Sequence, residues 1–172
     1  SAGSNMLKIL DSIGASLFTL TSSGTANFAG TVYADAFATN TTADLAEKFP
    51  TSDDTISAGD IVSVDPNNKE SIQLSNYPYQ PTILGIISTA PGLTLSASQP
   101  ASPAGRLPNH PTTQPVALAG RVPTKVNLEN GAIKAGDPIT SSSTPGVGMK
   151  ATQAGRVIGI ALENYPLCHP EL

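Results

Sequence analysis

Large apolar residues are widely spaced over the first forty positions and become dense only after residue 55. In residues 1–40 they alternate with polar ones, most clearly at 7–9 (LKI) and 18–20 (FTL), and glycines follow at positions 14, 24 and 30. This alternation predicts short strands separated by turns. Because so few large side chains cannot form a core, we expect a repetitive β stalk end that shares a thin interior with other copies of the chain. Residues 1–4 (SAGS) are interpreted as a remnant of expression.

Residues 41–50 (TTADLAEKFP) are predicted to form a helical elbow of one to two turns. Thr41 and Asp44 resemble a capping box with Asp in place of Glu, and Pro50 would end the helix. The elbow would connect the stalk to the remainder of the chain.

Residues 51–165 have the pattern of a β-rich head in which one motif occurs twice. Residues 56–62 (ISAGDIV) are echoed by 133–139 (IKAGDPI), and 83–87 (ILGII) by 157–161 (VIGIA). A Gly-Asp turn can precede a strand, since Gly tolerates positive φ and the Asp side chain accepts hydrogen bonds from nearby backbone N–H groups. The repeat predicts a mainly β fold with a pseudo-duplicated β-barrel or β-clip-like head.

A proline-rich segment interrupts the head. Residues 90–115 contain six prolines among Ser, Ala, Thr and Gln, which predicts a long exposed loop because proline removes ladder donors and small polar residues bury little surface. Residues 166–172 are expected to be an unpatterned tail.

Composition excludes several classes of function. The net charge is −4 with only nine Lys and Arg residues, so a nucleic-acid surface is not expected, and no apolar run reaches the ~18 residues of a transmembrane helix. Cys168 is the single cysteine, and the two histidines are His110 and His169. We therefore expect no metal, no cofactor and no membrane insertion.

Several short segments together resemble a known family. They are TTADLAE at 41–47, ILGIIS at 83–88, PVALAGRV at 115–122, and GDPI with GRVIGIA at 136–139 and 155–161. In this order they resemble the C-terminal intramolecular-chaperone autoprotease head of phage neck appendages and tail fibres, and similar heads of bacterial surface proteins. The resemblance implies a head that brings three chains into register, on a virion fibre or a bacterial cell surface.

The resemblance also implies self-cleavage near the elbow. Asp44 and Glu47 fall on the positions of the family's acidic residues, where a carboxylate can act as acid or base on the adjacent peptide. Asn40, Thr41 and Thr42 would lie beside the cleaved bond, although the family has a Ser-Asp pair where Asn40-Thr41 stands. Asn40 can cyclise, and either threonine can supply a hydroxyl nucleophile.

Three hypotheses follow from the sequence. The leading one is a non-enzymatic assembly module, the trimerisation and folding-nucleation head of an extracellular homotrimeric fibre. The second is an autoprotease that cleaves near residues 40–44. The third is a tip that binds a cell surface or a glycan, for which Tyr77 and Tyr79 are the closest pair of aromatic rings.

Overall fold

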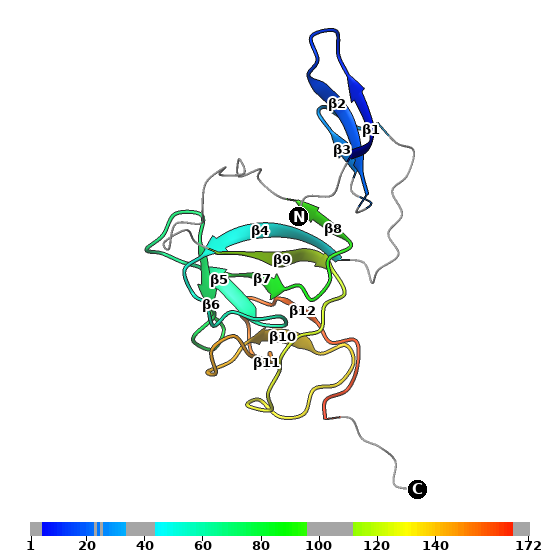
Figure 1. Cartoon of the computed structure of the whole chain (residues 1–172). Helices are drawn as coiled ribbons and strands as arrows, with labels where there is room; N and C mark the ends of the chain where they lie inside the picture. The colour runs from blue at the N-terminus through cyan, green and yellow to red at the C-terminus, as the bar shows by residue number, and fades with distance from the viewer. Residues whose placement is uncertain (1–4, 23, 25, 34–43, 96–111, 167–172) are drawn as a thin grey trace, which may run out of the picture. The chain divides into compact units, whose positions relative to one another are not determined.

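The computed structural model describes residues 5–22, 24, 26–33, 44–95 and 112–166 (Figure 1). The chain divides into two compact units, Ser1–Ala38 and Thr39–Leu172, which are described separately as unit 1 and unit 2. The expected mainly β character is confirmed, and no helix occurs in the described ranges.

Unit 1 contains one antiparallel sheet of three strands in the order β1-β2-β3. The strands are β1 (Asn5–Leu10), β2 (Ser16–Thr21) and β3 (Ala26–Phe28). Asp11 closes the turn between β1 and β2, because its carboxylate accepts the N–H groups of Ile13 at 3.0 Å and Ala15 at 2.8 Å. This is the side-chain-to-backbone bonding that favours Asp in turns.

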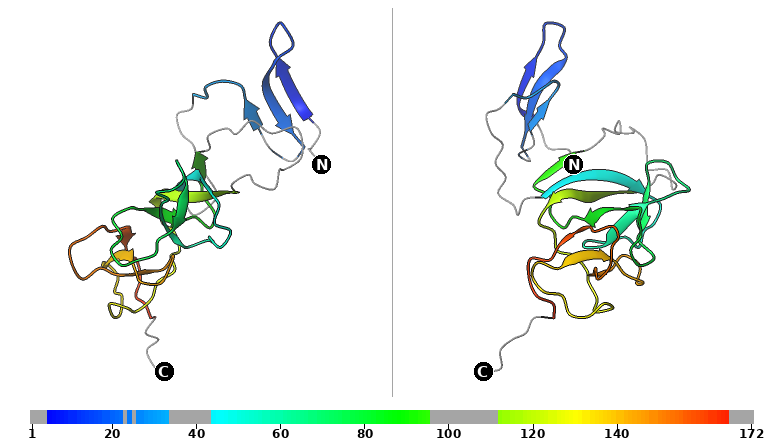
Figure 2. Two further views of the ribbon diagram at one scale, coloured as in Figure 1. Left: turned by 90° about the vertical axis from the view of Figure 1, so that its left-hand side faces the viewer. Right: turned by 180° about the vertical axis from the view of Figure 1, so that it is seen from behind.

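Unit 2 contains a six-stranded sheet and a smaller three-stranded sheet, ordered β6-β5-β7-β9-β4-β8 and β11-β10-β12. Only the β4–β8 pair in these sheets is parallel. In both figures β4 and β8 lie at one end of the unit and the small sheet at the other (Figures 1 and 2). The strands are β4 (Asp44–Thr51), β5 (Ile61–Val64), β6 (Ile72–Leu74), β7 (Ile83–Ile87), β8 (Leu93–Leu95), β9 (Thr112–Gly120), β10 (Pro138–Ser141), β11 (Gly148–Lys150) and β12 (Gly159–Ile160).

The predicted helical elbow is wrong over residues 44–50, which belong to strand β4. This strand pairs with β9 along its whole length, from Asp44 opposite Gly120 to Thr51 opposite Thr112. The non-local ladder outweighs the weak local preference of a helix this short. Residues 41–43 lie outside the described ranges.

Two further expectations about unit 2 need correction. No sheet in the described part closes into a barrel. The predicted loop 90–115 is shorter than expected, because strand β8 lies within it and β9 begins at Thr112. Residues 96–111 lie outside the described ranges.

The core of unit 2 lies on the six-stranded sheet. Five aliphatic side chains form its buried cluster, against which Phe49, Leu74 and Leu84 pack: Ile56, Val62, Ile72, Ile87 and Val116. The cluster draws on β5, β6, β7 and β9, so it forms only when strands distant in sequence have paired.

The repeated motif begins with the same turn in both copies, repeat 1 (residues 56–87) and repeat 2 (residues 133–161). The Asp60 carboxylate accepts the Ser57 N–H at 2.8 Å, and the Asp60 N–H donates to the Ser57 carbonyl at 3.1 Å. Asp137 makes the same two bonds with Lys134, at 2.7 and 2.9 Å. The glycine before each aspartate has positive φ, 83° and 93°, as the sequence motif predicts.

Each turn also pairs with the end of the third strand of its repeat in the same way. The Gly59 N–H donates to the Ile87 carbonyl at 2.9 Å, and the Ile87 N–H donates to the Asp60 carbonyl at 2.8 Å. The corresponding bonds in repeat 2, through Gly136 and Ala161, measure 2.8 and 2.9 Å. The strand orders β6-β5-β7 and β11-β10-β12 therefore correspond.

Replacement of Gly85 by alanine is expected to destabilise unit 2. A Cβ at this position would overlap Val116 and lie 2.7 Å from the Ala117 carbonyl oxygen, so β7 and β9 would have to separate. We expect a loss of about 1–3 kcal/mol in the free energy of unfolding, the usual cost of overpacking. Urea denaturation measures it. Gly30→Ala adds the same methyl group where nothing lies within 4 Å, and an equal loss in both variants would contradict the packing argument.

Candidate functional site

The sheet of unit 1 has one apolar face. In the strand register Ile9 lies opposite Phe18, and Phe18 lies opposite Phe28. The neighbouring row on the same face contains Leu7, Leu20 and Ala26. Since directly paired residues and residues two apart on a strand share a face, all six positions form one surface, which we call the apolar face.

The apolar face is largely uncovered. The exposed fractions of Leu7, Ile9 and Phe28 are 51%, 49% and 56%. The rings of Phe18 and Phe28 contact each other, with their centroids 5.0 Å apart. Each side chain is therefore shielded mainly by its neighbours within the sheet and not by a second layer.

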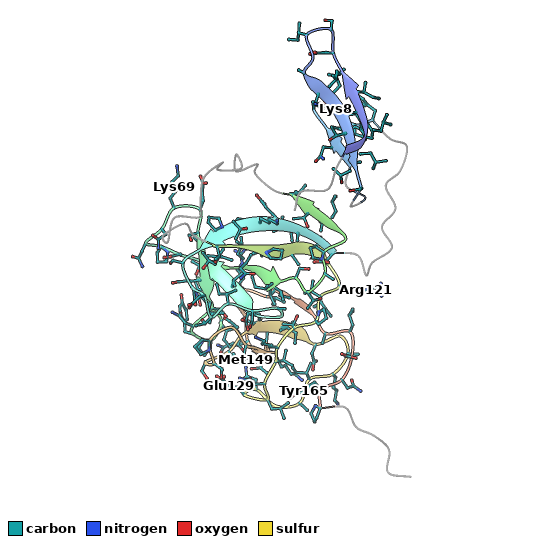
Figure 3. The ribbon with its side chains drawn as sticks, viewed as in Figure 1. Lys8, Lys69, Arg121, Glu129, Met149 and Tyr165 are labelled. Carbon is teal, nitrogen blue, oxygen red and sulfur yellow. The ribbon has the colours of Figure 1, made fainter. Side chains whose placement is uncertain are left out.

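The opposite face carries mainly polar groups, together with Leu17, which is 48% exposed. Its central row is Lys8, Thr19 and Asn27, and Figure 3 labels Lys8 on β1. The Asn27 amide donates to the Thr19 hydroxyl at 3.3 Å. The contrast between the faces is typical of a sheet with one face buried and one in water, yet no other described residue of unit 1 covers the apolar one.

The two predicted catalytic carboxylates lie on strand β4, on opposite faces. Asp44 is its first residue and is only 6% exposed, whereas Glu47 is half-buried. Because they are three positions apart on an unbroken strand, their side chains alternate to different faces. The structure does not bring them together as a pair.

Asp44 has an unusual environment for an acid. Among the described residues, nothing donates a hydrogen bond to its Oδ2, and the atom is buried. A buried carboxylate oxygen without a donor is costly and is a recognised mark of a reactive position. Asn40, Thr41 and Thr42, which precede Asp44, lie outside the described ranges.

Tyr77 and Tyr79 do not form a pair of free ring surfaces. The Tyr79 phenol oxygen accepts the Thr152 N–H at 2.8 Å and the Asn130 amide at 3.1 Å. The pKa of Tyr79 is lowered from its usual value, chiefly by its hydrogen bonds with Thr152. Tyr79 connects the segment after β6 to repeat 2 and is half-buried, whereas Tyr77 is 46% exposed.

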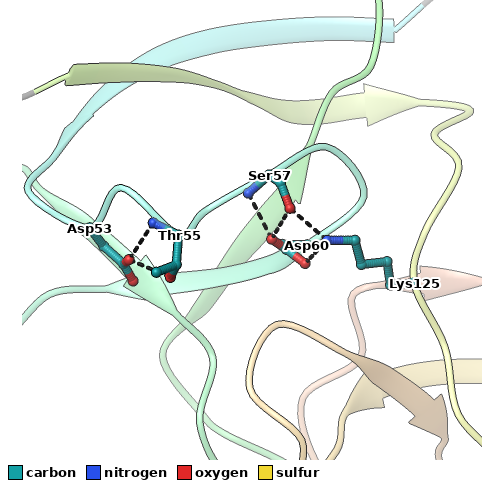
Figure 4. A network of polar contacts seen from close by, with 5 residues as sticks. All are labelled: Asp53, Thr55, Ser57, Asp60 and Lys125. Carbon is teal, nitrogen blue, oxygen red and sulfur yellow. Dashed lines mark hydrogen bonds and ion pairs between the residues drawn. The ribbon is translucent and has the colours of Figure 1, made fainter.

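A Gly-Asp turn of unit 2 forms a polar cluster that the sequence did not reveal (Figure 4). The Lys125 ammonium donates to Asp60 at 2.6 Å and to the Ser57 hydroxyl at 2.7 Å. That hydroxyl in turn donates to the Asp60 carboxylate at 3.0 Å. A serine beside a lysine is an arrangement found at nucleophilic sites, but here the lysine is paired with the Asp60 carboxylate. The cluster joins residue 125 to repeat 1.

Asp137 holds the corresponding position in repeat 2. Its pKa is lowered first by the backbone N–H of Lys134 and then by the hydrogen bond from Lys150, whose ammonium lies 3.0 Å away. The lysines pairing with the two turns come from positions 125 and 150. These ion pairs were not visible in the motif because both partners lie outside it.

Among the described residues, no cluster of three or more His, Cys, Asp or Glu side chains is placed to hold a metal ion. In the same part of the chain no helix is long and apolar enough to cross a membrane.

Asp137 is expected to make the stability of unit 2 depend on pH. Because its pKa is lower in the folded state, its contribution is present above the usual carboxyl pKa near 4 and is lost as the pH falls through the folded value. Asp137→Asn should therefore lower the urea midpoint at pH 7, and the difference from wild type should shrink below about pH 4. Asp54→Asn, at an exposed acid without a described partner, is the control. If the difference in urea midpoint between Asp137→Asn and wild type instead grew as the pH fell, the predicted pH dependence would be wrong.

Comparison with protein-family models, with curated proteins and with solved structures finds no match to this chain.

Proposed function

We propose that this chain is a structural assembly module, whose copies associate as a homotrimer at the head of an extracellular fibre. The observation that carries the proposal is the apolar face of unit 1, which is uncharged and is not covered by the other described residues of unit 1. The motif resemblance of unit 2 to fibre heads of virions and bacterial surfaces supports the same function.

Physical considerations favour self-association at this face. A three-stranded sheet stabilises itself only when its hydrophobic face is packed against another layer. Burial of apolar surface contributes roughly 25 cal/mol per Å², and Leu7, Ile9 and Phe28 leave about half of their surface available. A second copy offers a face of the same chemistry, without a charge to bury.

A threefold arrangement suits a face of this size. Three copies around one axis can turn three narrow apolar faces inward and leave every polar row, such as Lys8, Thr19 and Asn27, in solvent. When the copies are already associated, the first pairing between their stalk segments would cost less entropy than it would between separate chains. The module would thus act in folding as well as in the finished fibre.

Adjacent substitutions in strand β3 test the assembly function. Phe28→Asp places a carboxylate on the apolar face, whereas Asn27→Asp places it on the polar face. We expect light scattering to give a trimer for wild type and for Asn27→Asp, and a monomer for Phe28→Asp, because burying an unpaired charge is strongly unfavourable. A wild-type chain that is monomeric at micromolar concentration would overturn the proposed function.

A second candidate function, self-cleavage before β4, is favoured by the buried Asp44 carboxylate. Its Oδ2 lacks a described donor, and the strand begins directly after the segment in which the family resemblance places the cleaved bond. Since Glu47 lies on the opposite face of the strand, Asp44 would act without it.

Intact-mass spectrometry of the incubated full-length chain tests this candidate. Self-cleavage predicts two products that meet between residues 40 and 44, and Asp44→Asn should abolish them because it removes the charge at almost unchanged volume. Glu47→Asn should leave them unchanged. A single intact mass after prolonged incubation would contradict self-cleavage, whereas it would leave the assembly function standing.

A further inference from the structure

The third strand of repeat 1 is paired on both sides, by β5 on one side and β9 on the other. Ile87 directs its N–H and C=O towards the turn of repeat 1, so the backbone groups of Ile86 point the other way, as they alternate along a strand. There Ile86 lies opposite Ala117, and the Ser88 N–H donates to the Pro115 carbonyl at 2.8 Å. Strand β9 thus covers the outer edge of β7.

The third strand of repeat 2, β12, lacks this neighbour. Ala161 bonds to the turn of its repeat as Ile87 does, so the backbone groups of Ile160 point outward. The small sheet ends at β12, and within the described ranges no strand pairs with this outer edge. In repeat 2 no strand of the described residues occupies the position that β9 fills in repeat 1.

Side-chain exposure shows the same difference. Ile83 is 1% exposed, whereas Val157, its counterpart in repeat 2, is 42% exposed. Ile160 and Leu162, which correspond to Ile86 and Ser88, are 56% and 70% exposed. β12 and the residues flanking it therefore present three apolar side chains to solvent, whereas in repeat 1 Ile83 and Ser88 are buried and Ile86 is half-buried.

The central glycines of the two third strands give independent evidence. At Gly85 an added Cβ would overlap Val116 of β9, whereas at Gly159 no atom lies within 4 Å of the corresponding point. Gly85 is needed because β9 approaches closely. Position 159 is also a glycine, although no described strand lies beside it.

From the empty position we infer that the outer edge of β12 is a docking edge, which receives an extended strand from a second copy of this chain. This inference rests on the proposed self-association, and it assigns to unit 2 a contact between copies. The added strand would occupy the place that β9 has beside β7, and would satisfy the outward backbone groups of Ile160.

The best-suited strand for this edge is β8 of the second copy. It is the last strand of the six-stranded sheet, and no described strand pairs with its outer edge. Leu93 and Leu95 are 54% and 47% exposed, so they offer apolar surface to an equally apolar partner. β8 has three residues, which fits the short edge of β12.

A contact between two different edges sets the symmetry of the assembly. β8 is the last strand of the six-stranded sheet and β12 the last strand of the smaller sheet, so each copy would give one edge and receive the other. Contacts of this head-to-tail kind close into a ring when the rotation between copies closes and otherwise form a filament; the proposed threefold arrangement requires the closed ring.

Cross-linking in the full chain tests the docking edge. In a Cys168→Ser background, Leu93→Cys and Ile160→Cys are introduced together and treated with a short bismaleimide, which tolerates the unknown register. We expect a denaturing gel to show a ladder of covalent oligomers ending at the trimer. Leu93→Cys with Leu128→Cys is the matched control, since Leu128 is comparably exposed but follows Asn127, whose N–H bonds to Gly148 at the opposite edge of the sheet.

Further addition of Gly159→Ala should reduce the yield of the ladder at least tenfold, because the methyl group would meet the incoming strand as it would meet β9 at Gly85. Absence of a ladder while light scattering still gives a trimer would overturn the docking edge alone. Cross-linking by Ile160→Cys by itself, or within one chain, would overturn it as well. A monomer would overturn both this inference and the proposed function.

Discussion

The pairing of strand β9 between β7 and β4 is the interaction on which unit 2 depends. It joins residues about seventy positions apart, from Asp44 opposite Gly120 to Thr51 opposite Thr112, and it links that pair to repeat 1 through Ile86 and Ala117. Without β9 the six-stranded sheet would divide into β6-β5-β7 and β4-β8, and Val116 would leave the core. Because strand pairing is non-local, local preferences along β4 have little influence on its final structure.

The internal duplication shows how far local sequence determines structure here. Both Gly-Asp turns make the same backbone bonds to within about 0.2 Å, so the motif of five residues is sufficient for the turn. The two repeats differ in what lies beside the third strand. Gly85 is closed over by β9, and Gly159 has open space around it. Identical local chemistry thus leads to a covered strand in one repeat and an uncovered edge in the other.

The parts of the fold that the sequence predicted are those determined within a few residues. The duplicated turns and the alternation in unit 1 could be recognised because Gly, Asp and period-two hydrophobicity act locally. The helical elbow was wrong because TTADLAE satisfies a capping rule that the ladder with β9 overrides. The ion pairs of Asp60 and Asp137 could not be predicted, since Lys125 and Lys150 reach them only after the chain has folded. The apolar face of unit 1 could not be predicted, because it depends on the pairing register of the three strands, which the sequence pattern alone does not specify.

Both units share one property, namely that part of their hydrophobic surface is left uncovered by the other described residues of the same unit. In unit 1 it is the face around Phe18 and Phe28, and in unit 2 it is the edge around Ile160. Natural sheets usually protect such surfaces with charge or proline; the apolar face of unit 1 carries neither, and at β12 charged residues stand only beside the exposed apolar ones, at Arg156 and Glu163. A chain with only nine Lys and Arg residues and a net charge of −4 also opposes close approach of its copies only weakly. Low charge, an uncovered face and a vacant strand position are each unfavourable for an isolated chain, but together they are what an assembly of identical copies requires.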